Sequence, residues 1–258
     1  MRILMIGDVV GVPGCAFLRR HLPALKKIKG VDLCIANGEN SAAGNGITPA
    51  SAQHLFDSGV DFITTGNHVF ARCEVYNFLD ERNDVIRPAN YCADNPGKGF
   101  AVIDMGRAQV AVLNLSGNAF LGDSYENVFQ CAQRMLAQMQ PYRIVVVDLH
   151  AESTGEKRAV GFFLDGKVSV VAGTHTHVQT SDDQVLPGGT GYITDLGMVG
   201  PKQSVLGVKP EIIISRMRTG MPARFDVPDT DDCILNGCIF DVDERTGRTY
   251  ATERISME

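Results

Sequence analysis

The sequence predicts an α/β fold built from layers of sheet and helix. Short runs of β-branched or apolar residues alternate with segments whose apolar residues recur at helical spacing. Several of the apolar runs end directly before a cluster of polar residues, where open α/β sheets place ligands. With 258 residues, 44% of them hydrophobic, the chain can form one core, so we expect a single domain spanning residues 1–258.

The N-terminal quarter shows the alternation most clearly. Apolar strands are expected at residues 2–6, 32–36 and 62–64. Between the first two, residues 13–29 carry apolar side chains at helical spacing, and Pro23 is expected to kink or break this helix. A second helix, which begins with a proline in its first turn, is expected at residues 49–57.

The same alternation returns later in the chain. Further strands are expected at residues 144–149 and 169–172, and a helix is expected at residues 125–138. Ser153 and Glu156 have the spacing of a capping box, which indicates the start of another helix. The later strands also end just before polar residues.

Two hairpins complete the predicted elements. Residues 100–104 and 109–115 are separated by a short glycine-containing turn and should pair with each other. The tail, residues 232–256, contains two strand-like runs around a turn at residues 243–247 and should form a closing hairpin.

Composition and charge limit the classes of partner. The formal net charge of −6 disfavours binding to a polyanion, so we expect no stable nucleic-acid partner. A small anionic substrate stays compatible, because bound divalent ions would reverse the charge locally. The N-terminus resembles a first strand rather than an export signal and no long apolar run occurs, so we expect a cytoplasmic protein without a membrane partner. The seven cysteines lack zinc-finger spacing and are expected to be reduced.

The polar clusters after the apolar runs carry the candidate chemistry. Their members are carboxylates, amides and imidazoles: Asp8, Glu39, Asn40, Asn67, His68, His150, His175 and His177. Oxygen and imidazole donors presented together at one edge of a sheet suit two hard-to-borderline cations. Two such ions typically lie about 3.5–4 Å apart, and a shared carboxylate would bridge them.

Each cluster taken alone also has a purely structural explanation. Asp8 could cap a helix, and His150 could be a buried histidine satisfied by its neighbours. The pair His175 and His177 is harder to explain in this way, because alternation in an extended segment would direct both imidazoles to one side. Two histidines lie within helical patterns, away from the strand ends, and are assigned structural roles: His21 and His54.

The order of the motifs resembles a known superfamily. GD, GEN, GNH, LH and GTHTH follow one another as they do in the calcineurin-like metallophosphoesterases. The longer stretches GDVVGVPG, ANGENSAAGNGIT, TTGNH, DLHAE and AGTHTHVQT are similar to the YmdB branch of that superfamily, and the similarity spans essentially the whole chain. The resemblance implies a two-sheet β-sandwich flanked by helices in α-β-β-α layers, with the active site at the strand ends.

The resemblance also implies a ligand set for two metal ions per chain, with iron or manganese as the metal. One ion would be surrounded by Asp8, Glu39, Asn40 and His177, and the other by Glu39, Asn67, His150 and His175. Glu39 would therefore bridge the two ions. One position departs from the wider superfamily, because Val10 stands where an Asp-x-His motif has its histidine, and the branch would use Asn40 instead.

For activity, the resemblance implies a phosphodiesterase with 2′,3′-cyclic nucleotides as the favoured small-molecule substrates. A hydroxide held between the metals would attack phosphorus, and His68 would act as the general acid. Two alternatives stay open: a phosphomonoesterase of the nucleotidase type, and a metal-dependent regulatory protein that binds a nucleotide or RNA without turnover. A homo-oligomer is consistent with the family. The aromatic residues considered for stacking on a base cannot be ranked: Phe70, Tyr91, Phe120 and Tyr192.

Overall fold

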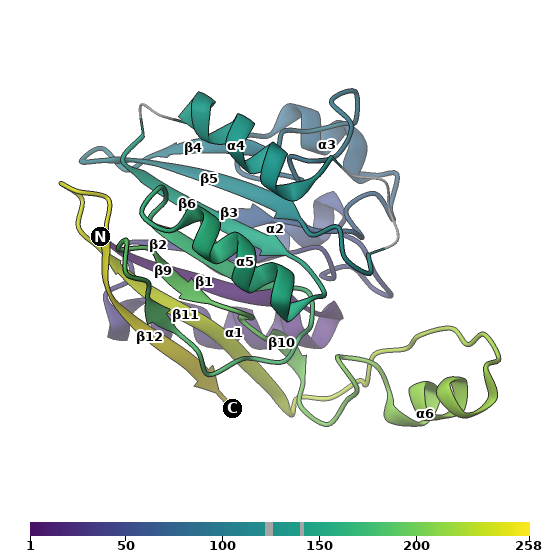
Figure 1. Ribbon diagram of the computed structural model, residues 1–258. Coiled ribbons are helices and arrows are strands. Elements are labelled where there is room, and N and C mark those ends of the chain that lie inside the picture. The colour runs from purple at the N-terminus through teal and green to yellow at the C-terminus, as the bar shows by residue number, and fades with distance from the viewer. Residues whose placement is uncertain (122–125, 140–141) are drawn as a thin grey trace.

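The computed structural model describes residues 1–121, 126–139 and 142–258. It contains two six-stranded sheets that pack face to face (Figure 1). The strands of the first sheet are, in order, β12 (Thr249–Met257), β11 (Cys233–Val242), β10 (Met198–Pro201), β1 (Arg2–Val9), β2 (Leu33–Asn37) and β3 (Phe62–Thr64). Those of the second are β4 (Phe100–Asp104), β5 (Gln109–Ser116), β6 (Ile144–His150), β7 (Val170–Thr174), β9 (Gly191–Ile193) and β8 (Gln184–Val185).

Parallel pairing brings the carboxyl ends of the central strands to one edge of each sheet. In the first sheet β10, β1, β2 and β3 run parallel, and in the second β5, β6, β7 and β9 do so. The two predicted hairpins are confirmed, because β4 pairs with β5 and β11 pairs with β12 in antiparallel register. The polar residues that follow the parallel strands are therefore gathered at the same end of the sandwich.

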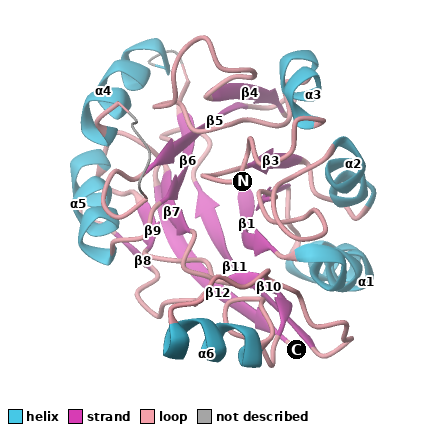
Figure 2. Ribbon diagram, turned by 90° about the vertical axis from the view of Figure 1, so that its right-hand side faces the viewer, coloured by secondary structure: helices cyan, strands magenta, loops and turns pink. Residues whose placement is uncertain are grey.

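Helices cover the outer faces of both sheets. Their bounds are α1 (Gly11–Lys29), α2 (Pro49–Asp57), α3 (Val75–Glu81), α4 (Val128–Met139), α5 (Thr154–Leu164) and α6 (Pro210–Thr219). Figure 2 shows α1, α2 and α3 on one side of the sandwich and α4 and α5 on the other. This arrangement confirms the predicted order of layers, helix, sheet, sheet and helix.

The layers follow from alternation along the strands. In β1, Ile3 and Met5 point into the core between the two sheets, whereas Leu4 and Ile6 pack against α1 and α2 on the outer face. Such a strand is buried on both faces, which explains why its sequence is an almost uninterrupted apolar run.

Three local predictions need correction. Helix α1 continues through Pro23, so the expected break does not occur. Ser153 does cap α5 by accepting a hydrogen bond from the backbone N–H of Glu156. The Glu156 carboxylate, however, does not return to Ser153 but accepts the backbone N–H groups of Asn118 and Ala119, so no reciprocal capping box forms. The helix expected at residues 125–138 is found at Val128–Met139, and residue 125 lies outside the described residues.

Helices α3 and α6 were not predicted. Helix α6 belongs to a long excursion between β10 and β11, residues 202–232, which we call the α6 arm (Figure 1). Figure 1 shows α6 and its flanking loops standing away from the body of the sandwich. Among the helices of the described chain, none is both long and apolar enough to cross a bilayer.

Candidate metal centre

The candidate residues meet at the shared edge of the two sheets. They lie at or just after the carboxyl ends of five strands: Asp8 in β1, Glu39 and Asn40 after β2, Asn67 and His68 after β3, His150 at the end of β6, and His175 and His177 after β7. Asp8 and His175 join the two sheets directly, because the backbone N–H of His175 donates to Oδ2 of Asp8 over 3.0 Å. All eight side chains predicted from sequence therefore belong to one site.

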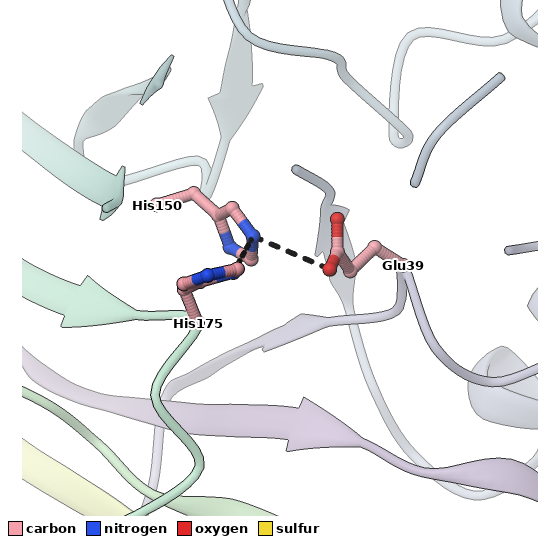
Figure 3. Close-up of side chains that lie close together, drawn as sticks. All are labelled: Glu39, His150 and His175. Atoms are coloured by element: carbon pink, nitrogen blue, oxygen red, sulfur yellow. Dashed lines mark hydrogen bonds and ion pairs between the residues drawn. The ribbon is translucent and has the colours of Figure 1, made fainter. Parts of the chain in front are cut away.

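Glu39, His150 and His175 form the tightest group. One potential ligand atom from each lies within 4.8 Å of the others, and Figure 3 shows the three side chains converging. Nε2 of His150 is 3.2 Å from Oε1 of Glu39 and 3.0 Å from Nδ1 of His175. The side-chain oxygen of Asn67 joins them, 2.9 Å from Nε2 of His150.

A second group of potential ligands also contacts Glu39. Oδ1 of Asp8 is 3.7 Å from Nε2 of His177. The amide nitrogen of Asn40 lies 3.4 Å from the same imidazole nitrogen and donates to Oε1 of Glu39 over 3.1 Å. Oε1 of Glu39 thus contacts members of both groups.

One buried oxygen in the site lacks a hydrogen-bond partner. Oδ1 of Asp8 has none within the described part of the chain, although the Asp8 side chain is fully buried. A buried carboxylate oxygen without a partner is strongly unfavourable unless a cation satisfies it. The residues present therefore fit a bound metal ion.

The imidazoles are oriented as metal ligands usually are. The hydroxyl of Thr174 donates to Asp148, so it accepts from Nδ1 of His150 over 2.9 Å and leaves the lone pair on Nε2 facing the site. In the same way, an outward nitrogen of each of the other two imidazoles lies near an oxygen acceptor. Nε2 of His175 is 3.0 Å from Glu152, and Nδ1 of His177 is 2.9 Å from the carbonyl oxygen of Leu206.

Asp148, two residues before His150 in β6, belongs to a buried network of hydrogen bonds. Its carboxylate accepts hydrogen bonds from Asn37, Thr64 and Thr174, and burial raises its pKa to about 6. Asn37, Thr64 and Thr174 were not singled out from the sequence. The available signal was alternation in β6, which puts Asp148 on the same face of the strand as His150.

Burial and neighbouring charges shift the pKa values of Glu39, His150 and His175 in different directions. Burial favours the neutral acid at Glu39, but the charge and hydrogen bond of His150 outweigh it and hold the pKa of Glu39 well below its usual range. Burial, together with the nearby His150, lowers the pKa of His175 to about 4. Burial alone would also lower the pKa of His150, but the carboxylates of Glu39 and Asp8 raise it to about 9. An ionised carboxylate and a neutral imidazole are the forms that bind metals. Glu39 and His175 therefore favour these forms, whereas His150 would release a proton when a metal binds.

The backbone of the two C-terminal histidines differs from the prediction. His175 and His177 do not lie in an extended segment: both have left-handed backbone angles, with φ of 99° and 62°. The chain turns at each of them, so strand alternation is not what brings both imidazoles to the site. Non-glycine residues in this region are strained and persist where surrounding contacts fix them.

Gly66 shows how closely the chain approaches the site. A Cβ atom at this position would lie 2.3 Å from Cδ2 of His150 and 2.4 Å from Oε2 of Glu39. Such a distance is impossible, so the predicted turn glycine before Asn67 is required by packing. The GNH motif therefore has a steric reason for its first residue.

His68 occupies the mouth of the site. Its side chain is 38% exposed, and Nδ1 lies 3.0 Å from the amide oxygen of Asn40 and 3.2 Å from Oε1 of Glu39. The hydrogen bond to Glu39 raises the pKa of His68, although burial opposes the shift.

The two histidines assigned structural roles are elsewhere: His21 packs against Phe17, and His54 lies beside the carbonyl of Cys15.

A cavity of about 580 Å³ opens over these residues. None of the four aromatic residues considered for base stacking lines it, and the one aromatic among its described lining residues is Phe225. Tyr192 is buried in the core under α5, whereas Phe120 is exposed elsewhere. Phe225 was missed because it lies in the α6 arm, where no strand end marks it.

The two-sheet sandwich, with potential ligands at its strand ends, is the fold of the calcineurin-like metallophosphoesterases. A 5′-nucleotidase precursor from Thermus thermophilus shares the fold, with a TM-score of 0.57 and 14% identity, over 100% of this chain and 54% of that chain. At this low identity the likeness concerns the fold alone.

The chain belongs to the YmdB-like protein family, whose model matches residues 4–255. It is 42% identical to the 2′,3′-cyclic-nucleotide 2′-phosphodiesterase of Bacillus subtilis, over 99% of this chain and 96% of the relative. It also resembles the solved structure of a novel phosphatase from Mycoplasma pneumoniae, with a TM-score of 0.94 and 33% identity, over 100% of this chain and 93% of that chain. The protein is therefore a phosphoric ester hydrolase.

Proposed function

We propose that the protein is a dinuclear-metal phosphodiesterase whose favoured substrates are 2′,3′-cyclic nucleotides. The observation that carries the proposal is that one oxygen of Glu39, Oε1, contacts both groups of potential ligands, over 3.2 Å to His150 and 3.1 Å to Asn40. The similarity to the Bacillus subtilis phosphodiesterase, which extends over 99% of the chain, supports the substrate class.

In this proposal two ions of iron or manganese are held by the residues inferred from sequence. Asp8, Glu39, Asn40 and His177 would hold one ion, and Glu39, Asn67, His150 and His175 the other. The unpartnered Oδ1 of Asp8 and the outward hydrogen bond of His177 support this assignment. When bound, the ions supply Lewis acidity that activates a water molecule and neutralises charge on the phosphoryl group.

His68 is the proposed general acid. Its Nδ1 faces the amide oxygen of Asn40, which can accept the proton on that nitrogen and so orient the ring. The hydrogen bond to Glu39 favours the imidazolium form, and this form can give a proton to the departing ribose oxygen. Partial exposure at the cavity mouth leaves His68 accessible to a bound ester.

Hydrolysis of phosphomonoesters is the second candidate. It is favoured by the similarity to the Mycoplasma pneumoniae phosphatase. The test compares 2′,3′-cyclic AMP, bis-p-nitrophenyl phosphate and p-nitrophenyl phosphate as substrates of the manganese-loaded protein. We expect faster turnover of the two diesters; faster monoester hydrolysis throughout would favour the second candidate, and binding without product would favour a regulatory protein.

We also propose that the protein works in the cytoplasm. All seven cysteines are free thiols, which is usual in a reducing compartment. The net charge of −6 supports small-molecule esters rather than nucleic acid as stable partners. A homo-oligomer stays a prediction, which light scattering of the purified protein can test.

A further inference from the structure

The cavity over the candidate metal centre has two chemically different halves. Its floor carries the polar side chains already described, among them Glu39, His68 and His177. Its wall is apolar and comes largely from the α6 arm, through Val205, Leu206, Val208, Met217, Phe225 and Val227. A phosphoryl group needs only the polar floor, so the wall requires a separate explanation.

The wall is attached to the floor by specific contacts. The carbonyl oxygen of Leu206 lies 2.9 Å from Nδ1 of His177, and Leu206 itself has a left-handed backbone with φ of 55°. Val205 and Val208 exchange backbone hydrogen bonds of 2.8 and 3.0 Å around that turn. The position of the wall is thereby tied to a candidate metal ligand.

The far end of the arm is tied back in the same way. The backbone N–H of Lys209 donates to the carbonyl of Asp226 over 2.9 Å, and the side chains of these residues form an ion pair. This contact places Phe225, which precedes Asp226, beside the start of α6. The backbone next to Phe225 is therefore held in place, so Phe225 does not lie at a free loop tip.

Phe225 combines exposure with a flat apolar face. The residue is 42% exposed although it lines the cavity, and the guanidinium carbon of Arg216 lies 4.9 Å from the ring centroid. An exposed aromatic ring beside an apolar wall is typical of a ligand site. Among ester substituents, a nucleobase supplies the complementary flat ring, and base stacking on aromatic side chains tolerates any base.

The size of the cavity agrees with such a ligand. Small-molecule sites usually occupy about 300–1,000 Å³ and combine an apolar lining with a few polar groups. At about 580 Å³, the cavity falls within this range and joins the floor to the wall without interruption.

We propose that the α6 arm forms a nucleobase subsite in which Phe225 stacks on the base of the substrate. The inference rests on the proposed nucleotide phosphodiesterase function, which it deepens by giving the wall a role. It predicts that the base contributes to substrate binding through the apolar wall, whereas the polar floor binds the cyclic phosphate.

The first test separates the base from the phosphate. 2′,3′-Cyclic AMP is compared with glycerol 1,2-cyclic phosphate, a cyclic diester without a base. In Phe225→Ala, KM for 2′,3′-cyclic AMP should rise about 5- to 150-fold, while turnover of the glycerol ester stays unchanged. Phe225→Tyr should restore the wild-type KM. Equal losses on both esters, or no loss on either, would overturn the subsite.

Phe162 provides a matched control. It lies on α5 outside the cavity, the residue is 53% exposed, and the guanidinium carbon of Arg158 lies 4.8 Å from its ring centroid. Phe162→Ala should leave both esters unaffected. If it raised KM for the nucleotide as much as Phe225→Ala does, the effect would be general and the subsite would be wrong.

The second test needs no turnover. The chain contains no tryptophan, so Phe225→Trp places a single indole in the wall. Adenosine should quench its fluorescence saturably, ribose should not, and the Phe162→Trp control should respond to neither. A wild-type protein that cleaves no 2′,3′-cyclic AMP would refute the proposed function, and quenching by adenosine would still decide the subsite. If adenosine had no effect on the fluorescence and self-association of the protein shielded the indole instead, the subsite would be wrong and the wall would be a contact with a second copy of the chain.

Discussion

Nζ of Lys157 lies 2.5 Å from Oδ2 of Asp195, and both side chains are buried. The same carboxylate oxygen accepts the backbone N–H and the hydroxyl of Thr176, over 3.1 and 2.8 Å. Thr176 stands between the two histidines with left-handed backbone angles. The ion pair therefore holds the turn that brings His175 and His177 to the candidate metal centre.

Removal of one partner from this pair should destabilise the fold. Lys157→Met leaves Asp195 buried without its counter-charge, which typically costs about 3–5 kcal/mol in the free energy of unfolding. Urea denaturation measures the change. Lys202→Met, which removes an exposed partner of Glu258, is the control and should leave stability unchanged.

A double variant separates positioning from stability. Lys157→Met combined with Asp195→Leu removes both charges and should recover much of the lost stability, since an apolar pair can replace a buried ion pair. It still lacks the acceptor for Thr176, so metal affinity and kcat should remain reduced. Full recovery of metal affinity would show that the pair has only a structural role.

His68→Ala should separate chemistry from metal binding. Metal content should be unchanged, while turnover of 2′,3′-cyclic AMP falls by about 10²–10⁴, because the ribose oxygen is a poor leaving group without a proton donor. A p-nitrophenyl diester, whose leaving group needs no proton, serves as the internal comparison and should lose much less. Loss of metal from the variant would place His68 among the ligands.

Gly66→Ala should prevent assembly of the centre. The added Cβ would overlap His150 and Glu39, which cannot both keep their positions. We expect reduced metal uptake, measured by elemental analysis. Gly155→Ala in the first turn of α5 is the control, because its Cβ would have no neighbour closer than 3.7 Å. Wild-type metal content in Gly66→Ala would contradict the packing around His150.

The thiols should divide into two reactive and five protected groups. Cys73 and Cys92 are exposed and the other five are buried, so a disulfide reagent should modify two thiols before denaturation and seven afterwards. Burial raises the pKa of Cys15 and of Cys131 to about 12. Below about pH 9 both the folded and the unfolded state hold the neutral thiol. Above that pH the unfolded state loses the proton while the folded state keeps it, so the free energy of unfolding should fall as the pH rises towards 12. Modification of more than two thiols in the folded protein would contradict the burial pattern.

Much of the fold and the site could be predicted because the signals are local. A strand such as β1 can be recognised by its apolar run, and the polar residue near its end, Asp8, indicates the edge of the sheet where ligands bind. The motifs from Asp8 to His177 follow one another in the same order as in a known superfamily, which made the resemblance recognisable. The domain assignment, one unit over residues 1–258, remains a proposal that a single cooperative unfolding transition would support.

The parts that escaped prediction depend on contacts between distant segments. The backbone of His175, which has a left-handed angle, donates to Asp8, and that of Thr176 donates to Asp195; no periodicity reveals these contacts. Helix α6 is mostly exposed, with Ile213 as its buried residue, so it lacks the apolar stripe by which core helices are recognised. Phe225 was overlooked because it follows α6 in the arm and belongs to neither an apolar strand nor a polar cluster at a strand end.

Metal content per chain, measured after reconstitution with manganese or iron, tests the proposed centre most directly. We expect about two equivalents in the wild-type protein, about one in Asp8→Ala, and loss of both in Glu39→Ala, because that carboxylate is shared. Lys202→Met should bind as the wild type does. Folded wild-type protein that takes up neither metal, or Glu39→Ala that still binds two ions, would contradict the assignment.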